Sequence, residues 1–155
     1  MQSRICSFTG HRTIYPRHAA SLPTQIDALL ERVIADGFCE FRTGGAIGFD
    51  TLVALKVLEK REKYPNIRLC LFLPCHGQEK GWSENLKEAY AYVLERADSV
   101  HYSCDSYVTG CMQKRNREMI DGASLCIAYC GSDRGGSAYT VGLARKNGIE
   151  VINLF

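Results

Sequence analysis

Short apolar segments alternate with amphipathic segments along this chain, and this alternation limits the fold more than any other feature of the sequence. In the amphipathic segments, apolar residues recur at the spacing of one helix face, as at Ile26, Leu29, Leu30 and Val33. Strands that alternate with helices form a parallel sheet with helices on both faces. The expected strands are Arg4–Phe8, Phe38–Arg42, Ile67–Leu73, Ser99–Tyr102, Ser124–Tyr129 and Val151–Leu154, and the expected helices are Pro23–Ala35, Asp50–Tyr64, Glu84–Ala97, Val108–Asp121 and Ala138–Lys146.

The pattern predicts an α/β fold of three layers, in which a mainly parallel sheet lies between two layers of helices. A chain of 155 residues has the size of one domain and buries about 70% of its unfolded surface. No repeat, low-complexity segment or linker divides the sequence. Residues 1–155 are therefore expected to form a single domain.

The charge and hydropathy of the chain narrow its expected partners. The formal net charge is +2, whereas domains that bind nucleic acid are typically strongly basic. No apolar run approaches the ~20 residues of a membrane span, so no membrane partner is expected. The N-terminus leads almost directly into a strand and lacks the apolar region of a signal peptide. We therefore expect a cytoplasmic protein.

The eight cysteines include no C-x-x-C pair, which argues against a disulfide framework and against a zinc site. Cys6, Cys39, Cys70 and Cys126 lie within apolar runs, where cysteine acts as a small hydrophobic residue. These thiols are expected to be reduced and structural, and no metal site is predicted. Metal binding is left as an alternative only for the cysteines in loops or at strand ends, which are Cys75, Cys104, Cys111 and Cys130.

Polar and glycine-rich segments follow four of the expected strands. Because ligands bind beyond the carboxyl ends of the strands in open α/β sheets, these segments are expected to line one site. The segments at the opposite edge, such as 65–66 and 147–148, look like plain connections. The four polar segments are Thr9–Arg12, Thr43–Thr51, Pro74–Gln78 with the nearby Trp82, and Gly131–Ser137.

The glycine-rich turn Gly44–Gly48 joins an expected strand to an expected helix. It matches neither the G-x-G-x-x-G fingerprint nor a Walker A loop. Such a turn brings backbone N–H groups to the positive end of a helix, which suits a phosphate or another anion. The alternative is a simple tight turn. Asp50 is either a helix cap or, if it contacts the ligand, a partner for a ribose hydroxyl, because a carboxylate would repel phosphate.

A second glycine turn, Gly135–Gly136, precedes another expected helix. Two such turns at one edge of a sheet suggest two ends of a single pocket. Arg134 is placed to pair with a phosphate in bidentate fashion, or else it is a solvated loop arginine. Ser137 and Thr140 are expected to contact the ligand or to cap the helix.

Further candidate residues lie in the polar segments that follow the first and third expected strands, and in the expected helix that contains residue 115. Gly10, His11 and Arg12 follow the first strand, where the histidine is expected to donate to phosphate, to transfer a proton or to bond to backbone. Trp82 is expected either to stack on a base or to pack against the neighbouring helix. Arg115 and Asn116 are expected to point toward the edge of the sheet, or else the charges of this run belong to a solvated helix face. Asp121 either ends the helix or accepts a hydrogen bond.

Taken in order, these segments resemble the YpsA-like branch of the SLOG superfamily, which also contains the DNA-processing protein DprA and the LOG phosphoribohydrolases. The resemblance covers nearly the whole chain, from residue 4 to residue 155. The motifs that carry it are Thr9-Gly10-His11-Arg12, Gly44-Gly45-Ala46 with Gly48-Phe49-Asp50, Pro74 with Gln78 and Trp82, Arg115-Asn116 with Met119-Ile120-Asp121, and Gly135-Gly136-Ser137 with Thr140.

The resemblance implies a Rossmann-like fold that binds a nucleotide or a nucleotide-derived ligand such as ADP-ribose, NAD or AMP. LOG enzymes carry a catalytic glutamate after their second glycine turn, and Gly142 stands at that position here. LOG-type catalysis is therefore not expected. The residues expected to bind the ligand are Gly10, His11, Arg12, Gly44, Gly45, Ala46, Gly48, Asp50, Gln78, Trp82, Arg115, Asn116, Arg134, Gly135, Gly136, Ser137 and Thr140.

Three functional hypotheses follow from these residues. The first is a module that binds or senses a nucleotide ligand without turnover, with no certain cofactor. The second is a hydrolase of a nucleotide N-glycosidic or phosphate bond that uses His11, Asp50 and Asp121 for proton transfer. The third, less favoured, is binding of single-stranded DNA, as in DprA. Apolar faces on several helices also permit a homodimer.

Overall fold

The computed structural model describes residues 4–155 of the chain. These residues form six strands and six helices that follow one another in an α/β order. The strands are β1 (Arg4–Gly10), β2 (Phe38–Thr43), β3 (Arg68–Leu73), β4 (Ser99–Tyr102), β5 (Leu125–Tyr129) and β6 (Glu150–Asn153). The helices are α1 (Pro16–Ala19), α2 (Leu22–Ala35), α3 (Phe49–Lys63), α4 (Glu84–Arg96), α5 (Cys111–Ile120) and α6 (Gly136–Lys146).

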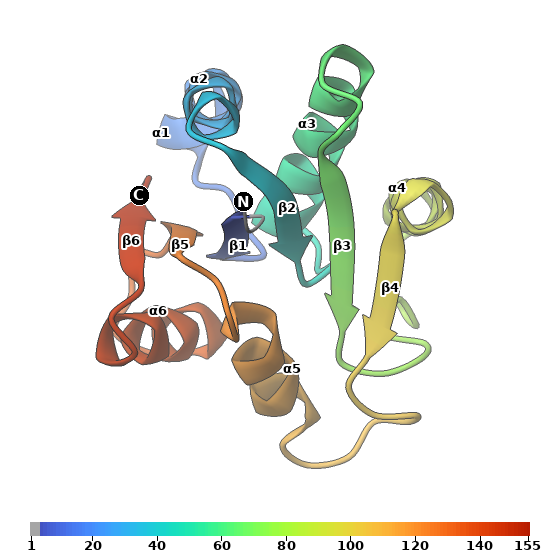
Figure 1. Ribbon diagram of the computed structural model, residues 1–155. Helices are drawn as coiled ribbons and strands as arrows, with labels where there is room; N and C mark the ends of the chain where they lie inside the picture. The colour runs from blue at the N-terminus through green and yellow to red at the C-terminus, as the bar shows by residue number, and fades with distance from the viewer. Residues whose placement is uncertain (1–3) are drawn as a thin grey trace.

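The strands form one sheet in the order β4-β3-β2-β1-β5-β6, and every neighbouring pair is parallel. Helices α1 to α4 lie on one side of the sheet, and α5 and α6 lie on the other (Figure 1). The chain moves outward from β1 to β4 and then returns through α5 to β5, on the other side of β1. The prediction of a three-layer α/β fold with a parallel sheet is therefore confirmed.

The hydrophobic core lies on both faces of the sheet, because helices cover both. All five residues of β5 are buried, as expected for a central strand of a parallel sheet. On the side of α2 and α3 the core includes Leu30, Phe41 and Val53. On the side of α5 and α6 a smaller cluster contains Ile120, Cys126 and Ala144.

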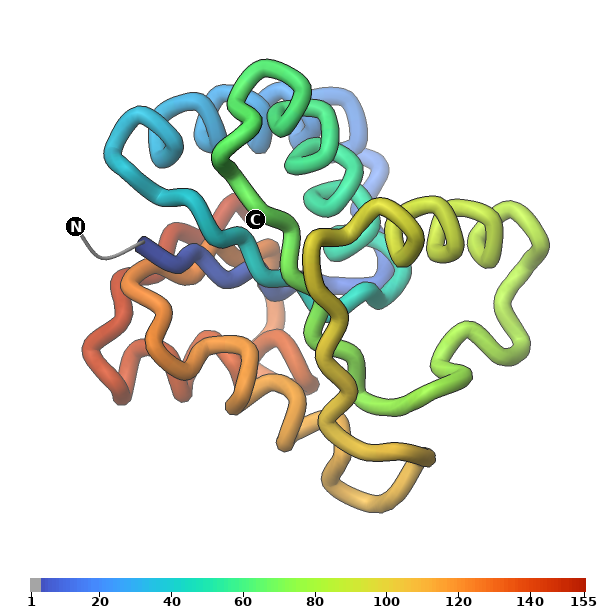
Figure 2. The backbone as a smooth tube through the Cα atoms, turned by 45° about the vertical axis from the view of Figure 1, so that its right-hand side comes forward, coloured from blue at the N-terminus to red at the C-terminus, as the bar shows by residue number. Residues whose placement is uncertain are grey.

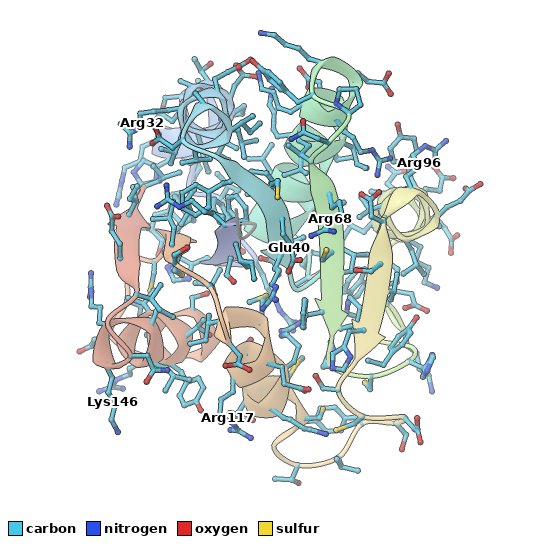
Figure 3. The ribbon with its side chains drawn as sticks, in the orientation of Figure 1. Arg32, Glu40, Arg68, Arg96, Arg117 and Lys146 are labelled. Carbon is cyan, nitrogen blue, oxygen red and sulfur yellow. The ribbon has the colours of Figure 1, made fainter. Side chains whose placement is uncertain are left out.

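At the β2–β3 part of the sheet, charged side chains take the place of apolar ones. The guanidinium of Arg68 donates to the carboxylate of Glu40 across the two strands, at 3.1 Å (Figure 3). Arg42 pairs with the same carboxylate at 2.6 Å and also donates to the backbone oxygen of Asp121, at 2.7 Å. Arg42 thereby fixes the C-terminal end of α5 to the sheet.

Several element boundaries differ from those expected from the sequence. The one-turn helix α1 falls in a segment where no element was expected. Helix α5 begins at Cys111 rather than at Val108, because the preceding Gly110 adopts a left-handed conformation with φ of 90°. Tyr107 and Val108 therefore lie in an exposed loop. Helix α6 begins at Gly136, two residues earlier than expected.

The loops that follow β3 and β4 run beside each other at one edge of the molecule (Figure 2). The N–H of Cys104 donates to the oxygen of Pro74 at 3.0 Å, and the N–H of Ser103 donates to the oxygen of Leu73 at 2.9 Å. All eight cysteines are free thiols. Among residues 4–155, no group of three or more metal-ligating side chains is placed to hold a metal ion. Within the same range, every helix is too short or too polar to cross a bilayer.

Candidate functional site

A cavity of about 390 Å³ lies beyond the carboxyl ends of β1, β2 and β5. Its position beside β1 is where the order of the sheet reverses, which is the usual place of ligands in folds of this class. Its volume falls within the range of small-molecule sites. The residues that line it are Thr9, Gly10, His11, Arg12, Ala46, Asp50, Met112, Gln113, Arg115, Asn116, Met119, Arg134, Gly135, Gly136 and Ser137.

The first glycine turn, Gly44–Gly48, lies very close to the loop that follows β1. Gly48 has φ of 83°, and a Cβ atom there would lie 2.3 Å from the backbone oxygen of Arg12. Beside it, the N–H of Phe49 donates to the oxygen of His11 at 3.1 Å. The N-terminal end of α3 is therefore joined to the loop that follows β1. A side chain at Gly48 would separate these two parts of the cavity wall.

Asp50 lies in the first turn of α3 and is only 6% exposed. One carboxylate oxygen, Oδ2, accepts a hydrogen bond from the Ala46 N–H at 3.2 Å. The other, Oδ1, is buried and has no hydrogen-bond partner among residues 4–155. Burial raises the pKa of Asp50 to about 6, against the opposing charge of Arg115. The Ala46 amide is thus occupied by Asp50, and the Oδ1 atom retains its capacity to accept a hydrogen bond.

Arg115 is buried beneath the cavity, with 7% of its surface exposed. Its guanidinium donates to the backbone oxygens of Gly44, at 2.8 Å, and Phe72, at 3.2 Å, and to the side chain of Asn116, at 2.9 Å. Burial lowers the pKa of Arg115, while the Asp50 carboxylate opposes this effect. Arg115 therefore ties the ends of β2 and β3 to α5, and its positive charge acts more strongly on Asp50 than that of Arg12.

The second glycine turn opens on the same cavity from the side of β5. Gly135 precedes α6 with φ of 95°. No side chain among residues 4–155 caps the helix, and its first turn carries no acidic residue. The partial positive charge of the helix N-terminus is therefore not neutralised locally, unlike that of α3, where Asp50 lies in the first turn. Arg134 is exposed beside this turn. An anion in the cavity would be accommodated at this end.

His11 joins the two sides of the cavity. Its Nε2 atom accepts a hydrogen bond from the Gly131 N–H at 2.8 Å, which requires a neutral ring with the proton on Nδ1. The ring packs edge-on against Tyr129 and Phe155. In this state, His11 positions the loop that leads into the second glycine turn.

Replacing His11 with alanine should loosen that loop. The Gly131 N–H loses its acceptor, at an expected cost of about 1 kcal/mol. Hydrogen exchange at this amide, measured by NMR, should become about fivefold faster. The His11→Gln variant is the control, because its side-chain oxygen can still accept the bond. Equal exchange rates in the parent protein and in His11→Ala would contradict this role.

Other residues predicted from the sequence lie outside the cavity. Gln78 lies in the loop that follows β3, and its side-chain amide contacts the backbone oxygens of Gly44 and Gly45. Trp82 packs edge-on against Tyr90 and joins the core rather than the cavity wall. Thr140 is buried and donates to the oxygen of Gly136 within α6. Asp121 follows the last residue of α5 and does not line the cavity, whereas residues within that helix do.

Three residues that line the cavity were not expected from the sequence. Met112, Gln113 and Met119 all come from α5. On that helix, Met112, Arg115 and Met119 follow the i, i+3, i+7 spacing of a single face. This spacing would have indicated that the two methionines accompany Arg115 to the site rather than to the core alone.

Comparison with known proteins places this chain in a family. A family profile named YpsA and described as the YspA SLOG family matches residues 15–148. A UPF0398 protein of Bacillus thuringiensis (strain Al Hakam) is 29% identical over 122 residues, which are 77% of this chain and 66% of the relative. A UPF0398 protein of Bacillus cereus (strain Q1) gives the same values. The matched region thus spans slightly less than two thirds of these relatives.

Two solved structures share the fold. DNA processing protein A (DprA) from Streptococcus pneumoniae superposes with a TM-score of 0.68 and 17% identity, over 97% of this chain and 50% of that one. DprA from Helicobacter pylori gives a TM-score of 0.70 and 17% identity, over 97% of this chain and 64% of that one. These identities establish a common Rossmann-like fold alone. The family profile covers most of the chain, and this protein therefore belongs to the YpsA (YspA SLOG) family.

Proposed function

We propose that this protein binds or senses a nucleotide or a nucleotide-derived ligand in the cavity beside β1. The observation that carries the proposal is the pairing, in one cavity, of a helix N-terminus and a buried carboxylate oxygen that have no side-chain cap and no hydrogen-bond partner, respectively, in the described part of the chain. The N-terminus of α6 and Arg134 suit a phosphate. The Oδ1 atom of Asp50 suits a hydroxyl donor such as that of a ribose. A nucleotide combines both groups at a short separation.

The residues at the candidate catalytic positions favour binding of the ligand without LOG-type turnover. Gly142 occupies the position of the LOG glutamate. Of the three groups considered for proton transfer, Asp121 lies away from the cavity and His11 is engaged with Gly131. Hydrolysis remains testable by incubating the protein with nucleoside monophosphates or NAD and analysing the products for free base or phosphate. If the protein releases free base or phosphate, and if this release requires Asp50, its function is catalysis rather than binding alone.

Replacing Gly136 with aspartate should weaken binding strongly and leave the fold intact. A Cβ atom at this position meets only the side chain of Asn116, at an ordinary 3.8 Å. The new carboxylate stabilises the N-terminus of α6 but repels an anion from it. We expect at least a tenfold loss of affinity for AMP, ADP-ribose or NAD, measured by calorimetry after a thermal-shift screen that includes cyclic nucleotides.

The matched control is Gly142→Asp, which adds the same charge to the same helix at an exposed position with open space around it. It should leave affinity unchanged. If the parent protein binds none of these compounds at millimolar concentration, the proposed function is wrong. If Gly136→Asp and the parent bind equally well, the ligand lies elsewhere.

Binding of single-stranded DNA is a second candidate. One observation favours it: the related fold of H. pylori DprA is described with a single-stranded DNA binding mode. Here Arg12 and Arg134 line the cavity, and Arg117 is exposed on α5 (Figure 3). Binding through such residues must weaken steeply with salt.

Fluorescence polarisation of a labelled oligonucleotide at low salt tests this candidate. The double variant Arg12→Ala/Arg134→Ala should lose the signal, whereas Lys146→Ala, at the far end of α6, should keep it. An unchanged polarisation with the parent protein would exclude this function.

A further inference from the structure

A second cavity of about 350 Å³ adjoins the first and contains neither Asp50 nor the second glycine turn. Two residues, Arg12 and Met112, line both cavities and therefore form their common boundary. The rest of the second cavity comes from the loops that follow β3 and β4, which lie side by side (Figure 2). A ligand that passes Arg12 can therefore occupy both spaces.

The side chains of the second cavity differ in chemistry from those of the first. Two aromatic rings line it, His76 and Tyr107, and Tyr107 is 70% exposed. The ring of His76 stacks on Tyr102, with centroids 3.7 Å apart and an interplanar angle of 19°, which holds it in one orientation. Exposed aromatic rings in a cavity are platforms for a flat ring, because stacking needs no specific hydrogen bonds.

Positive charge accompanies these rings. Lys80 lines the second cavity, and Arg12 lies at its boundary with the first. Met112, at the same boundary, is a flexible side chain that adapts to ring-shaped ligands. A cation next to aromatic platforms favours an electron-rich ring that carries an anionic group. This is the chemistry of a nucleobase joined to phosphate.

We propose that the second cavity binds the flat heteroaromatic ring of the ligand, between His76 and Tyr107, while its anionic and hydroxyl groups lie in the first cavity. The ligand class is thereby narrowed to nucleotides that span both cavities across Arg12. This inference rests on the proposed function for the placement of the anion. It adds that the loops after β3 and β4, rather than Trp82, recognise the ring.

The test compares ligands that carry one part or both. Ribose 5-phosphate carries the anion and the hydroxyls, adenosine carries the ring, and AMP and NAD carry both. In the double variant His76→Ala/Tyr107→Ala, affinity for AMP, NAD and adenosine should fall about tenfold or more, and affinity for ribose 5-phosphate should not change. Tyr92→Ala, which removes an exposed ring from α4, is the matched control and should have no effect.

NMR of the His76 ring and of the Ser137 amide separates this inference from the proposed function. Adenosine should shift the His76 signals, and ribose 5-phosphate should shift the Ser137 amide. If ribose 5-phosphate binds but the double variant retains full affinity for AMP, the ring lies outside the second cavity and the inference is overturned. If adenosine shifts His76 while no anion binds, the proposed anion site fails and the ring site stands. If none of the four compounds binds, both are overturned.

Discussion

Replacing Asp50 with asparagine is expected to raise the free energy of unfolding at pH 8 by up to about 3 kcal/mol. Burial raises the pKa of this carboxyl from its usual 3.8 to about 6. The folded protein therefore holds the proton more tightly than the unfolded chain does. Ionised Asp50 destabilises the fold, and asparagine removes that charge while it keeps an oxygen for the Ala46 N–H.

The sign of this effect fixes its pH dependence. Below about pH 4 the carboxyl is protonated in both states, so the parent and Asp50→Asn should be equally stable. Between about pH 4 and pH 6 the parent loses stability relative to the variant, and above pH 6 the difference is constant. Urea denaturation of both proteins at pH 4 and pH 8 measures this difference in the free energy of unfolding. Asp36→Asn, which changes an exposed carboxylate, is the control and should show no such difference.

A stabilising substitution at a cavity residue would indicate that the native carboxylate is retained for ligand binding rather than for folding. The same variant should accordingly bind the proposed ligand at least tenfold more weakly, because asparagine carries no negative charge to strengthen a ligand hydrogen bond. If Asp50→Asn were less stable than the parent at pH 8, the buried charge would instead be part of what holds the fold together.

The sequence predicted the layers of this fold well because they depend on local patterns. Each apolar run became a strand, and the amphipathic segments became helices that cover both faces of the sheet. The edge of the sheet that carries the polar loops follows from the parallel order of the strands alone. The segment at α1 was missed because a single turn of helix gives too short a pattern to recognise.

The candidate site was harder to predict because its details depend on contacts between distant segments. The sequence does not indicate that Asp50 occupies the Ala46 amide, or that Arg115 turns inward to the oxygens of Gly44 and Phe72. The first glycine turn looked like an anion site, and Arg115 was expected either at the edge of the sheet or on a solvated helix face. In the folded protein, the turn is closed by a carboxylate that the buried arginine in turn partly neutralises.

Removing the Arg115 guanidinium is expected to cause the largest loss of stability of any change considered for this protein. The Arg115→Met variant keeps much of the buried volume but removes the guanidinium hydrogen bonds to the oxygens of Gly44 and Phe72. It also removes the positive charge that acts most strongly on the Asp50 carboxylate. Breaking a buried charged network in this way typically costs about 3–5 kcal/mol. Arg117→Met, at an exposed position on the same helix, should change stability by no more than about 0.5 kcal/mol.

A double-mutant cycle then separates the two contributions of Arg115. In the Asp50→Asn background no charge remains to be neutralised, so the additional cost of Arg115→Met should be smaller than in the parent, and the difference measures the coupling between the two side chains. The backbone hydrogen bonds of Arg115 account for the cost that remains. Urea denaturation at pH 8 gives all four free energies. A cost for Arg115→Met that is identical in both backgrounds would mean that this arginine serves only to join α5 to the ends of β2 and β3, and that the Asp50 charge is stabilised by other means.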